Sequence, residues 1–272
     1  MMKIWDKLYK FLIVKYMSLK EKTFSSHDTR IKYMLFRGKQ NVPNTLIIVF
    51  SAYNKERAVY NYVRSLKQFD IPRLYIKDDF GPQRTGSYYL GEKGKHNVEP
   101  AVISLINRII NDLFRENSNP KLIFVGSSKG GYAALNFAVE FDNSYAIVGA
   151  PQYKLGDHLN EEYFYPMLED IIGIRTKENI AQLNDHIREK YKNKSNLLKQ
   201  TIYIQYSEKE WSYVFNESTY QKHIKFLIED IETLTNIVLE REVLDYKDHN
   251  DVHLYYPNYL VNKVNLILEE NK

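Results

Sequence analysis

The 272-residue chain contains no cysteine, which excludes disulfide-stapled scaffolds, thiolate metal sites and a cysteine nucleophile. Its charges nearly balance, with 38 Lys and Arg against 34 Asp and Glu and a formal net charge of +4. No basic stripe with interleaved aromatic residues accompanies this small excess, so we expect no nucleic-acid partner. An apolar content of 44% with 26% charged residues is that of an ordinary folded chain.

Long apolar runs are also missing at the N-terminus. Charges interrupt the first fifteen residues every few positions, so these residues form neither a signal-peptide core nor a spanning helix of about 20 apolar residues. Apolar residues nonetheless recur there at helical spacing, at Ile4, Trp5, Leu8, Phe11 and Leu12. We predict a helical segment over residues 1–30 that packs on the core or makes a peripheral contact with a membrane or a protein complex. The expected location is cytoplasmic.

Further along the chain, short apolar runs alternate with helical segments, which is typical of a mostly parallel sheet with helices on both faces. The predicted strands are Ile31–Phe36, Thr45–Phe50, Arg73–Ile76, Lys121–Val125, Tyr145–Val148, Thr201–Tyr206 and Ile237–Val243. The predicted helices are Lys55–Gln68, Pro100–Phe114, Gly131–Phe141, Tyr220–Leu234 and Tyr259–Glu269. Residues 153–199 show helical spacing and no convincing strand. We therefore predict one α/β domain over 1–272, with a helical cap inserted at 153–199.

Glycine is scarce, with 11 residues in the chain, and several glycines surround one serine. Gly126, Ser128 and Gly130 form the pattern G-x-S-x-G, directly after a predicted strand and before a predicted helix. A sharp strand-to-helix turn projects a serine hydroxyl above the sheet edge, and small residues on either side let the two backbones approach. The pattern predicts Ser128 as a nucleophile. A phosphate-binding loop is the alternative, although the sequence G-x-x-x-x-G-K-[ST] is absent.

A nucleophilic serine needs a base within hydrogen-bond reach and a carboxylate that orients this base. His249 and His253 both follow the last predicted strand, where the base is expected, and we prefer His249 because its surroundings are polar. The loop after Thr201–Tyr206 supplies Glu208 and Glu210. We prefer Glu210, because the strand must end before the carboxylate turns back towards the histidine. The sequence leaves both alternatives open.

An oxyanion formed at Ser128 needs backbone N–H donors. We expect one donor from Lys129, the residue after the serine, because the start of a helix favours negative charge. The second donor is expected in the loop after the strand that ends at Phe50, from Ala52 or Tyr53. The sequence does not distinguish these two residues, because backbone donors have no side-chain signature.

The polar loop from Asp78 to Asn97 holds four glycines and two adjacent tyrosines. Tyr88 and Tyr89 have two interpretations: a wall that stacks on sugar rings, with Arg84 as a polar contact, or a cover for the sheet edge. No metal site and no cofactor are predicted.

The segment Val125–Leu135 resembles the α/β-hydrolase superfamily, and four segments spread between about residues 45 and 257 carry a closer resemblance to groups within it. They are Ile76–Gly81, Gly86–Gly91, Val125–Leu135 and His249–Val252. Within the superfamily, the chain is similar to capsular-polysaccharide biosynthesis proteins of the XcbB/CpsF type and to the hydrolase-like, glycan O-acetylating component of the accessory Sec system. The resemblance implies an α/β-hydrolase fold and a triad of Ser128, Glu210 and His249 that acts on acyl esters.

Two functions follow from this resemblance. The first is a serine-dependent esterase or O-acetyltransferase that acts on acyl esters of a bacterial surface or capsular glycan through an acyl-enzyme. The second is a catalytically inactive partner protein in glycan biosynthesis or adhesin export.

Overall fold

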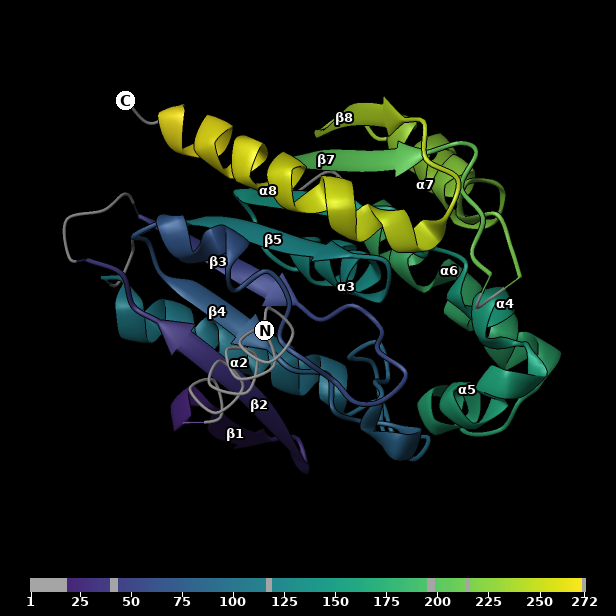
Figure 1. Ribbon diagram of the computed structural model, residues 1–272. Helices are drawn as coiled ribbons and strands as arrows, with labels where there is room; N and C mark the ends of the chain where they lie inside the picture. Colours follow the sequence, from purple (N-terminus) through teal and green to yellow (C-terminus); the bar gives the residue numbers. More distant parts are fainter. Residues whose placement is uncertain (1–18, 40–43, 116–118, 195–198, 214–215, 271–272) are drawn as a thin grey trace, which may run out of the picture.

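The computed structural model describes residues 19–39, 44–115, 119–194, 199–213 and 216–270, so the predicted N-terminal stripe from Ile4 to Leu12 lies outside the described residues. Across the described ranges, eight strands form one sheet in the order β1-β2-β4-β3-β5-β6-β7-β8 (Figure 1). β1 pairs with β2 and β2 with β4 antiparallel, and the remaining pairs are parallel. The strands are β1 (Lys22–Ser26), β2 (Thr29–Phe36), β3 (Thr45–Phe50), β4 (Arg73–Ile76), β5 (Lys121–Ser127), β6 (Ser144–Gly149), β7 (Gln200–Ser207) and β8 (Ile237–Leu244).

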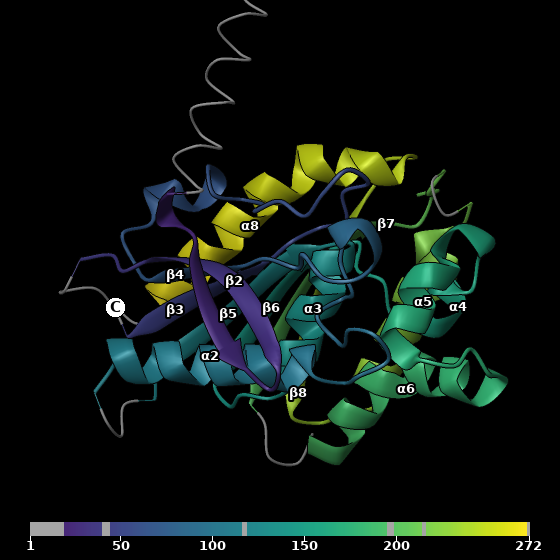
Figure 2. The same cartoon turned by 90° about the horizontal axis from the view of Figure 1, so that it is seen from below.

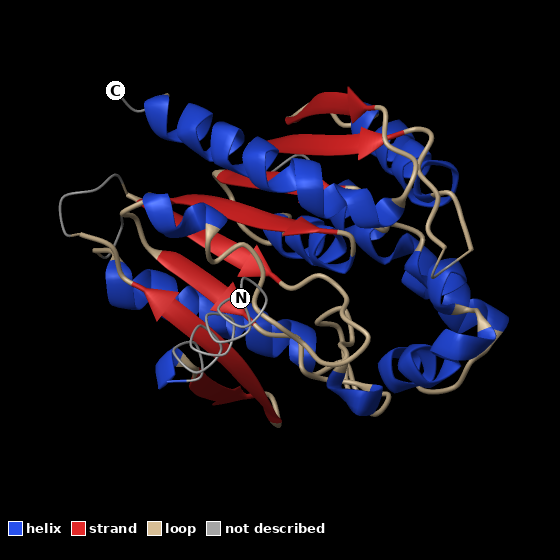
Figure 3. Cartoon of the chain, viewed as in Figure 1, coloured by secondary structure: helices blue, strands red, loops and turns tan. Residues whose placement is uncertain are grey.

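Helices cover both faces of this sheet. Helix α8 lies on one face, and α2 and α3 lie on the other (Figure 2). The helices are α2 (Val98–Leu113), α3 (Lys129–Ala138), α4 (Leu155–Leu159), α5 (Tyr165–Ile172), α6 (Lys177–Lys194), α7 (Lys225–Glu232) and α8 (Val252–Glu269). α4 and α5 lie beyond the carboxyl ends of the central strands (Figure 3). Among the described residues, no helix is both long and apolar enough to cross a membrane.

The core lies along the central parallel strands. Leu46 to Phe50 of β3 are at most 1% exposed, and Ile123 to Val125 of β5 are fully buried. Parallel strands with helices on both faces bury side chains on each side, which explains why their sequences read as continuous apolar runs. All seven strands predicted from such runs are confirmed.

The predicted helix over Lys55–Gln68 is wrong, since only a short 3₁₀ turn forms, at Ser65–Gln68. The Ala58 N–H, which a helix would bond internally, donates instead to the Arg84 carbonyl, 3.1 Å away. Tyr62 has a φ of +59°, outside the helical region, and its hydroxyl lies 2.5 Å from Ser127 Oγ. Tertiary contacts therefore override the local helical pattern.

Two further boundaries differ from the prediction. The helical segment expected over 1–30 does not extend to its end, because β1 and the start of β2 occupy residues 22–30. The last helix begins at Val252 rather than Tyr259 and includes Pro257. Pro257 lies at the sixth position of this helix, and its first turn is preceded by the 3₁₀ turn His249–Asp251.

The loop after β4 folds its tyrosines into the core. Tyr88 and Tyr89 are at most 1% exposed, so neither ring can stack on a sugar, and the proposed sugar-binding wall is corrected. The Tyr89 ring packs edge-on against Phe50, with ring centroids 5.1 Å apart. Its hydroxyl accepts the Ser51 N–H at 2.7 Å and donates to the Ile76 carbonyl at 2.9 Å. Tyr89 therefore joins the ends of β3 and β4.

We expect Tyr89→Phe to lower the free energy of unfolding by about 1–3 kcal/mol, because a buried Ser51 N–H loses its acceptor. Urea denaturation measures this change. Tyr213→Phe is the matched control, since Tyr213 is 71% exposed. Equal stabilities of the two variants would contradict the assignment of Tyr89 to the core network.

Candidate active site

Ser128 lies on a strained turn between β5 and α3. Its φ and ψ are +52° and −120°, a region that residues other than glycine seldom adopt. The Ser128 N–H donates to the Gly149 carbonyl at 2.8 Å, which fixes the turn to β6. A Cβ at Gly126 would lie 2.3 Å from the Gly130 carbonyl oxygen. The G-x-S-x-G spacing therefore reflects a close approach of strand and helix backbones.

Three of the predicted side chains meet at this turn. His249 Nε2 lies 2.9 Å from Ser128 Oγ, and His249 Nδ1 lies 2.5 Å from Glu210 Oε1. The Glu210 side chain is fully buried and the imidazole is 12% exposed. A buried carboxylate at Nδ1 holds the proton on that nitrogen, so Nε2 is left to accept the serine hydroxyl proton.

The loops that carry Glu210 and His249 are joined by main-chain hydrogen bonds. The Trp211 N–H donates to the Lys247 carbonyl at 2.9 Å, and the His249 N–H donates to the Trp211 carbonyl at 3.1 Å. These bonds extend the parallel pairing of β7 and β8 beyond the ends of both strands. The separation of carboxylate and imidazole is therefore set by the sheet.

Glu208 and His253, the alternatives that the sequence left open, both point away from this cluster. Both are exposed. His253 lies in α8, where its Nδ1 contacts the Asn250 carbonyl. The structure therefore brings Glu210 and His249 to Ser128 and leaves the two alternatives at the surface.

Helix α8 holds the histidine loop against the serine turn. Tyr256, two helical turns after His249, is fully buried. Its hydroxyl accepts the Gly126 N–H at 3.0 Å and donates to the Ile147 carbonyl at 2.5 Å. One phenol thus bridges β5 and β6 directly beside the turn.

A buried ion pair lies beneath the turn. Lys129 Nζ is 2.5 Å from Asp78 Oδ2, and the two side chains are 1% and 0% exposed. The Asp78 carboxylate also accepts the Ser87 N–H. Burial lowers the pKa of Lys129, and Asp78 opposes that shift. Gly86, with a φ of +124°, makes room, because a Cβ there would lie 2.4 Å from Lys129 Nζ.

The candidate oxyanion donors differ in availability. Lys129 begins α3, so its N–H belongs to the first turn, where amides have no acceptor within the helix. The Ala52 N–H already donates to Asn61 Oδ1 at 3.0 Å. Tyr53 lies next to it, with its ring against Phe164.

Arg84, which the sequence suggested as a polar contact to the substrate, lies away from this turn. It is exposed and lines an open pocket of about 530 Å³ whose lining includes neither Ser128 nor His249.

One further side chain, not expected from the sequence, contacts Ser128. Gln152, in the loop after β6, is 2% exposed. Its Nε2 lies 2.9 Å from Ser128 Oγ and its Oε1 lies 3.3 Å away. The only sequence signal is its position, four residues after the predicted strand Tyr145–Val148.

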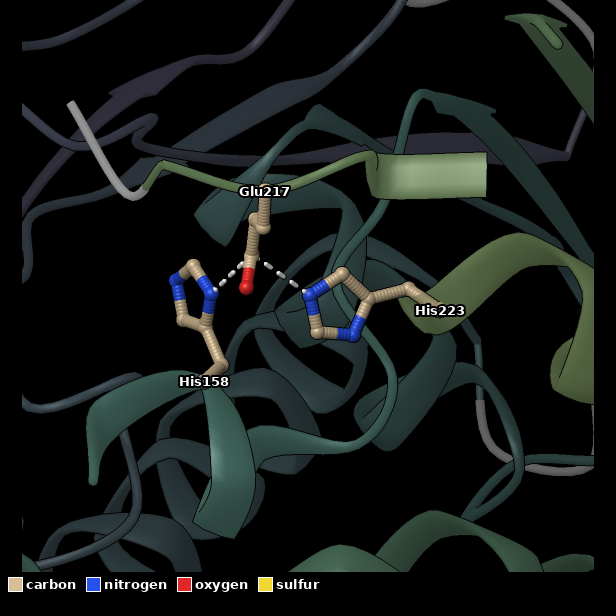
Figure 4. Close-up of side chains that lie close together, drawn as sticks. All are labelled: His158, Glu217 and His223. Atoms are coloured by element: carbon tan, nitrogen blue, oxygen red, sulfur yellow. Dashed lines mark hydrogen bonds and ion pairs between the residues drawn. The ribbon is translucent and has the colours of Figure 1, made fainter. Parts of the chain in front are cut away.

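A second buried polar cluster borders the site and consists of His158, Glu217 and His223 (Figure 4). Both imidazoles point at one carboxylate oxygen: His158 Nδ1 lies 2.6 Å from Glu217 Oε1, and His223 Nε2 lies 3.0 Å from it. His158 comes from α4, Glu217 from the segment after β7, and His223 from the π-helical turn Tyr220–Ile224. The cluster therefore ties α4 to the chain that follows Glu210.

The hydrogen bonds around this cluster decide whether it suits a metal ion. His223 Nδ1 accepts the N–H groups of Tyr153 and Lys154, each at 3.2 Å. Nδ1 is therefore unprotonated, and Nε2 carries the proton that it donates to Glu217. A metal at Nε2 would require the opposite tautomer. The cluster is accordingly a hydrogen-bond network, although its ligand types are those that zinc uses.

Charge within the network follows from these contacts. Burial acts to raise the pKa of Glu217, but the hydrogen bonds from His158 and His223 outweigh it and the net pKa is lowered. Burial lowers the pKa of His158 to about 4, against the opposing effect of Glu217. At neutral pH His158 is thus a neutral donor to the Glu217 carboxylate.

A family model described as "Accessory Sec system GspB-transporter" matches residues 24–272. The chain belongs to this accessory Sec family. The resemblance noted from the sequence is therefore confirmed at the level of the family. No curated protein sequence gives a match.

Solved structures resemble this accessory Sec family member at low identity. The capsule O-acetyltransferase of Neisseria meningitidis serogroup A has a TM-score of 0.69 and 21% identity, over 91% of this chain and 94% of that one. The Gap123 complex of Streptococcus agalactiae has a TM-score of 0.68 and 14% identity, over 92% of this chain and 46% of that one. The acylaminoacyl peptidase of Pyrococcus horikoshii has a TM-score of 0.63 and 13% identity, over 92% of this chain and 40% of that one. These likenesses confirm the α/β-hydrolase fold.

The buried ion pair of this accessory Sec family member yields a double-mutant prediction. Lys129→Met leaves the Asp78 charge unpaired, and we expect a loss of about 3–5 kcal/mol in the free energy of unfolding. The double variant Lys129→Met/Asp78→Asn should lose less than the two single losses combined, because it removes both charges. Urea denaturation of all four proteins tests this, and additive losses would contradict a coupled pair.

The depressed pKa of His158 yields a prediction for acid stability. The pKa of His158 is about 4 in the folded protein and 6.5 in the unfolded chain. Between these two pH values only the unfolded chain binds the proton, so the free energy of unfolding decreases as the pH falls from 6.5 towards 4. His158→Asn keeps an N–H donor near Glu217 and removes this titration. We expect its melting temperature to fall less between pH 7 and pH 4.5 than that of the unmodified protein; an unchanged difference would oppose the assignment.

Proposed function

We propose that this accessory Sec family member is a serine-dependent acyltransferase or esterase that acts on acyl esters of a bacterial surface glycan. The observation that carries the proposal is the continuous hydrogen-bonded chain from Glu210 through His249 to Ser128 on a strained strand-to-helix turn. Nucleophilic serine catalysis needs this order of carboxylate, imidazole and hydroxyl.

In the first half of the reaction Ser128 becomes acylated. His249 Nε2 takes the hydroxyl proton while Oγ attacks the acyl carbonyl, and Glu210 stabilises the imidazolium that forms. The N–H of Lys129 at the start of α3 is the proposed donor to the oxyanion. When the intermediate collapses, the bond from the acyl carbon to the leaving group breaks, and the leaving group takes the proton from His249.

In the second half an acceptor removes the acyl group. The oxygen of a glycan hydroxyl, or of water, attacks the ester carbonyl and gives its proton to His249. The bond to Ser128 Oγ then breaks, and the serine recovers that proton. A variant of the structurally similar meningococcal enzyme has been solved with CoA, so we propose an acetyl-CoA thioester as one acyl donor. Transfer and hydrolysis differ only in the acceptor that reaches the acyl-enzyme.

The helices over 153–199 have a proposed role in choosing this acceptor. α4 and α5 stand beyond the carboxyl ends of the central strands (Figure 1), and Ser128 directly follows the carboxyl end of β5. We therefore retain the interpretation of one domain over 1–272 with a cap at 153–199, in which the cap limits access to Ser128.

A second candidate function is a catalytically inactive partner in adhesin export. The family description favours it, because it names a secretion system, and the match to the Gap123 complex is to an assembly. The intact Glu210–His249–Ser128 chain favours catalysis. Peripheral contact with a membrane or a complex through residues 1–30 remains part of this second proposal.

Labelling of the purified chain with a fluorophosphonate probe distinguishes the two functions. We expect the unmodified protein to react, Ser128→Ala to lose labelling completely, and Glu210→Gln to react about 10⁴-fold more slowly because the imidazole loses its orienting charge. Glu208→Gln and His253→Ala are matched controls that should react at the unmodified rate. A folded protein that does not react would favour the inactive partner, and full labelling of Ser128→Ala would exclude Ser128 as the nucleophile.

A further inference from the structure

Gln152 holds its carboxamide against Ser128 Oγ from a rigid loop. Ala150, two residues earlier, has a φ of +38° and donates its N–H to the Gln205 carbonyl of β7 at 2.8 Å. The next two residues after Gln152, Tyr153 and Lys154, donate their N–H groups to His223 Nδ1. The loop is thus fixed on both sides of Gln152, by the sheet and by the His158–Glu217–His223 network.

The positions of the protons around Ser128 Oγ determine whether the Gln152 carboxamide donates or accepts a hydrogen bond there. The hydroxyl has one proton, and His249 Nε2 at 2.9 Å is its acceptor because Glu210 holds the other imidazole proton on Nδ1. The oxygen lone pairs are then free to accept an N–H from Gln152 Nε2 at 2.9 Å, which is closer than Oε1 at 3.3 Å. A donor on this side keeps the hydroxyl proton directed at His249.

The same bond becomes stronger as the reaction starts. Negative charge develops on Oγ when His249 takes the proton, and hydrogen bonds to charged acceptors are about twice as strong as those to neutral ones. The carboxamide is 2% exposed, so water does not compete for the interaction. An interaction that strengthens on the way to the transition state accelerates the chemical step.

We infer that Gln152 is a fourth catalytic residue, which donates its carboxamide N–H to Ser128 Oγ, directs the hydroxyl proton to His249 and stabilises the developing serine alkoxide. This inference rests on the proposed function, because it assigns Gln152 a role in acylation of Ser128. The residue is distinct from the oxyanion donors expected at Lys129 and Ala52 or Tyr53, since its contact is with the nucleophile itself.

The rate of fluorophosphonate labelling as a function of pH tests this role. Gln152→Met keeps the length of the side chain and removes the donor, so we expect labelling to be about 10- to 100-fold slower in a folded protein. Gln152→Glu has nearly the same shape. Its carboxylate would stabilise the protonated imidazole of His249, so we expect slower labelling and an acid limb of the pH–rate profile about one pH unit higher.

The chain offers a matched control in Gln200. Its Nε2 donates to Ser144 Oγ at 2.7 Å, and the residue is 3% exposed. Both residues begin their strands, so they lie at the amino ends of β6 and β7, whereas Ser128 follows the carboxyl end of β5. Gln200→Met removes the same type of bond, and we expect it to lower the melting temperature without changing the labelling rate or its pH profile. A purely structural effect of Gln152→Met would resemble this control.

The outcomes separate the inference from the function on which it rests. Labelling of Gln152→Met at the unmodified rate, or an unshifted pH profile in Gln152→Glu, would overturn the role of Gln152 and leave the proposed function intact. An unmodified protein that reacts no faster than Ser128→Ala would overturn both. If Gln152→Met fails to fold, the near-isosteric Gln152→Glu variant decides through its labelling rate at pH values above its acid limb, where the loss of the N–H donor acts on the rate independently of the imidazole pKa; an unmodified rate there would overturn the role of Gln152.

Discussion

The strained backbone at Ser128 is the constraint on which the candidate site depends. A positive φ at a serine costs about 1–3 kcal/mol and persists only where the surroundings enforce it. Here the enforcement comes from the Gly149 carbonyl, which binds the Ser128 N–H, and from Tyr256, whose hydroxyl bridges β5 and β6. Tyr256 lies in α8, which begins three residues after His249. The packing of this one helix therefore both supports the turn and places the imidazole.

Two buried polar groups add to this support from different sides. The side chain of Lys129, the first residue of α3, forms a buried ion pair with Asp78. The Ser87 N–H also donates to this carboxylate and so offsets part of the cost of removing its charge from water. The Glu217 carboxylate, held by two imidazoles, fixes the loop of Gln152 through His223. Each group joins elements that are far apart in the sequence, the first through Asp78 and Ser87 and the second through His158 and His223.

The wrong or missing predictions from the sequence have a common cause, which is contacts between distant parts of the chain. The segment 55–68 has a helical pattern, but its main chain binds Arg84 and its Tyr62 hydroxyl reaches Ser127. Tyr88 and Tyr89 stand in a polar, glycine-containing stretch that reads as a surface loop, and yet both rings are buried. Gln152 has no motif at all, because a carboxamide becomes a partner of Ser128 only after β5 and β6 lie side by side.

The sequence by itself determined seven of the eight strands in the described ranges and the position of the turn, because apolar runs and the G-x-S-x-G spacing are local properties of the chain. It also limited the acid and the base to two residues each. Only the tertiary structure brings Glu210 rather than Glu208, and His249 rather than His253, to Ser128, since their positions depend on main-chain bonds between the ends of β7 and β8. Contacts between residues 24 to 121 positions apart, such as those of Gln152 and His249 with Ser128, follow from sheet order and helix packing, which no local pattern records.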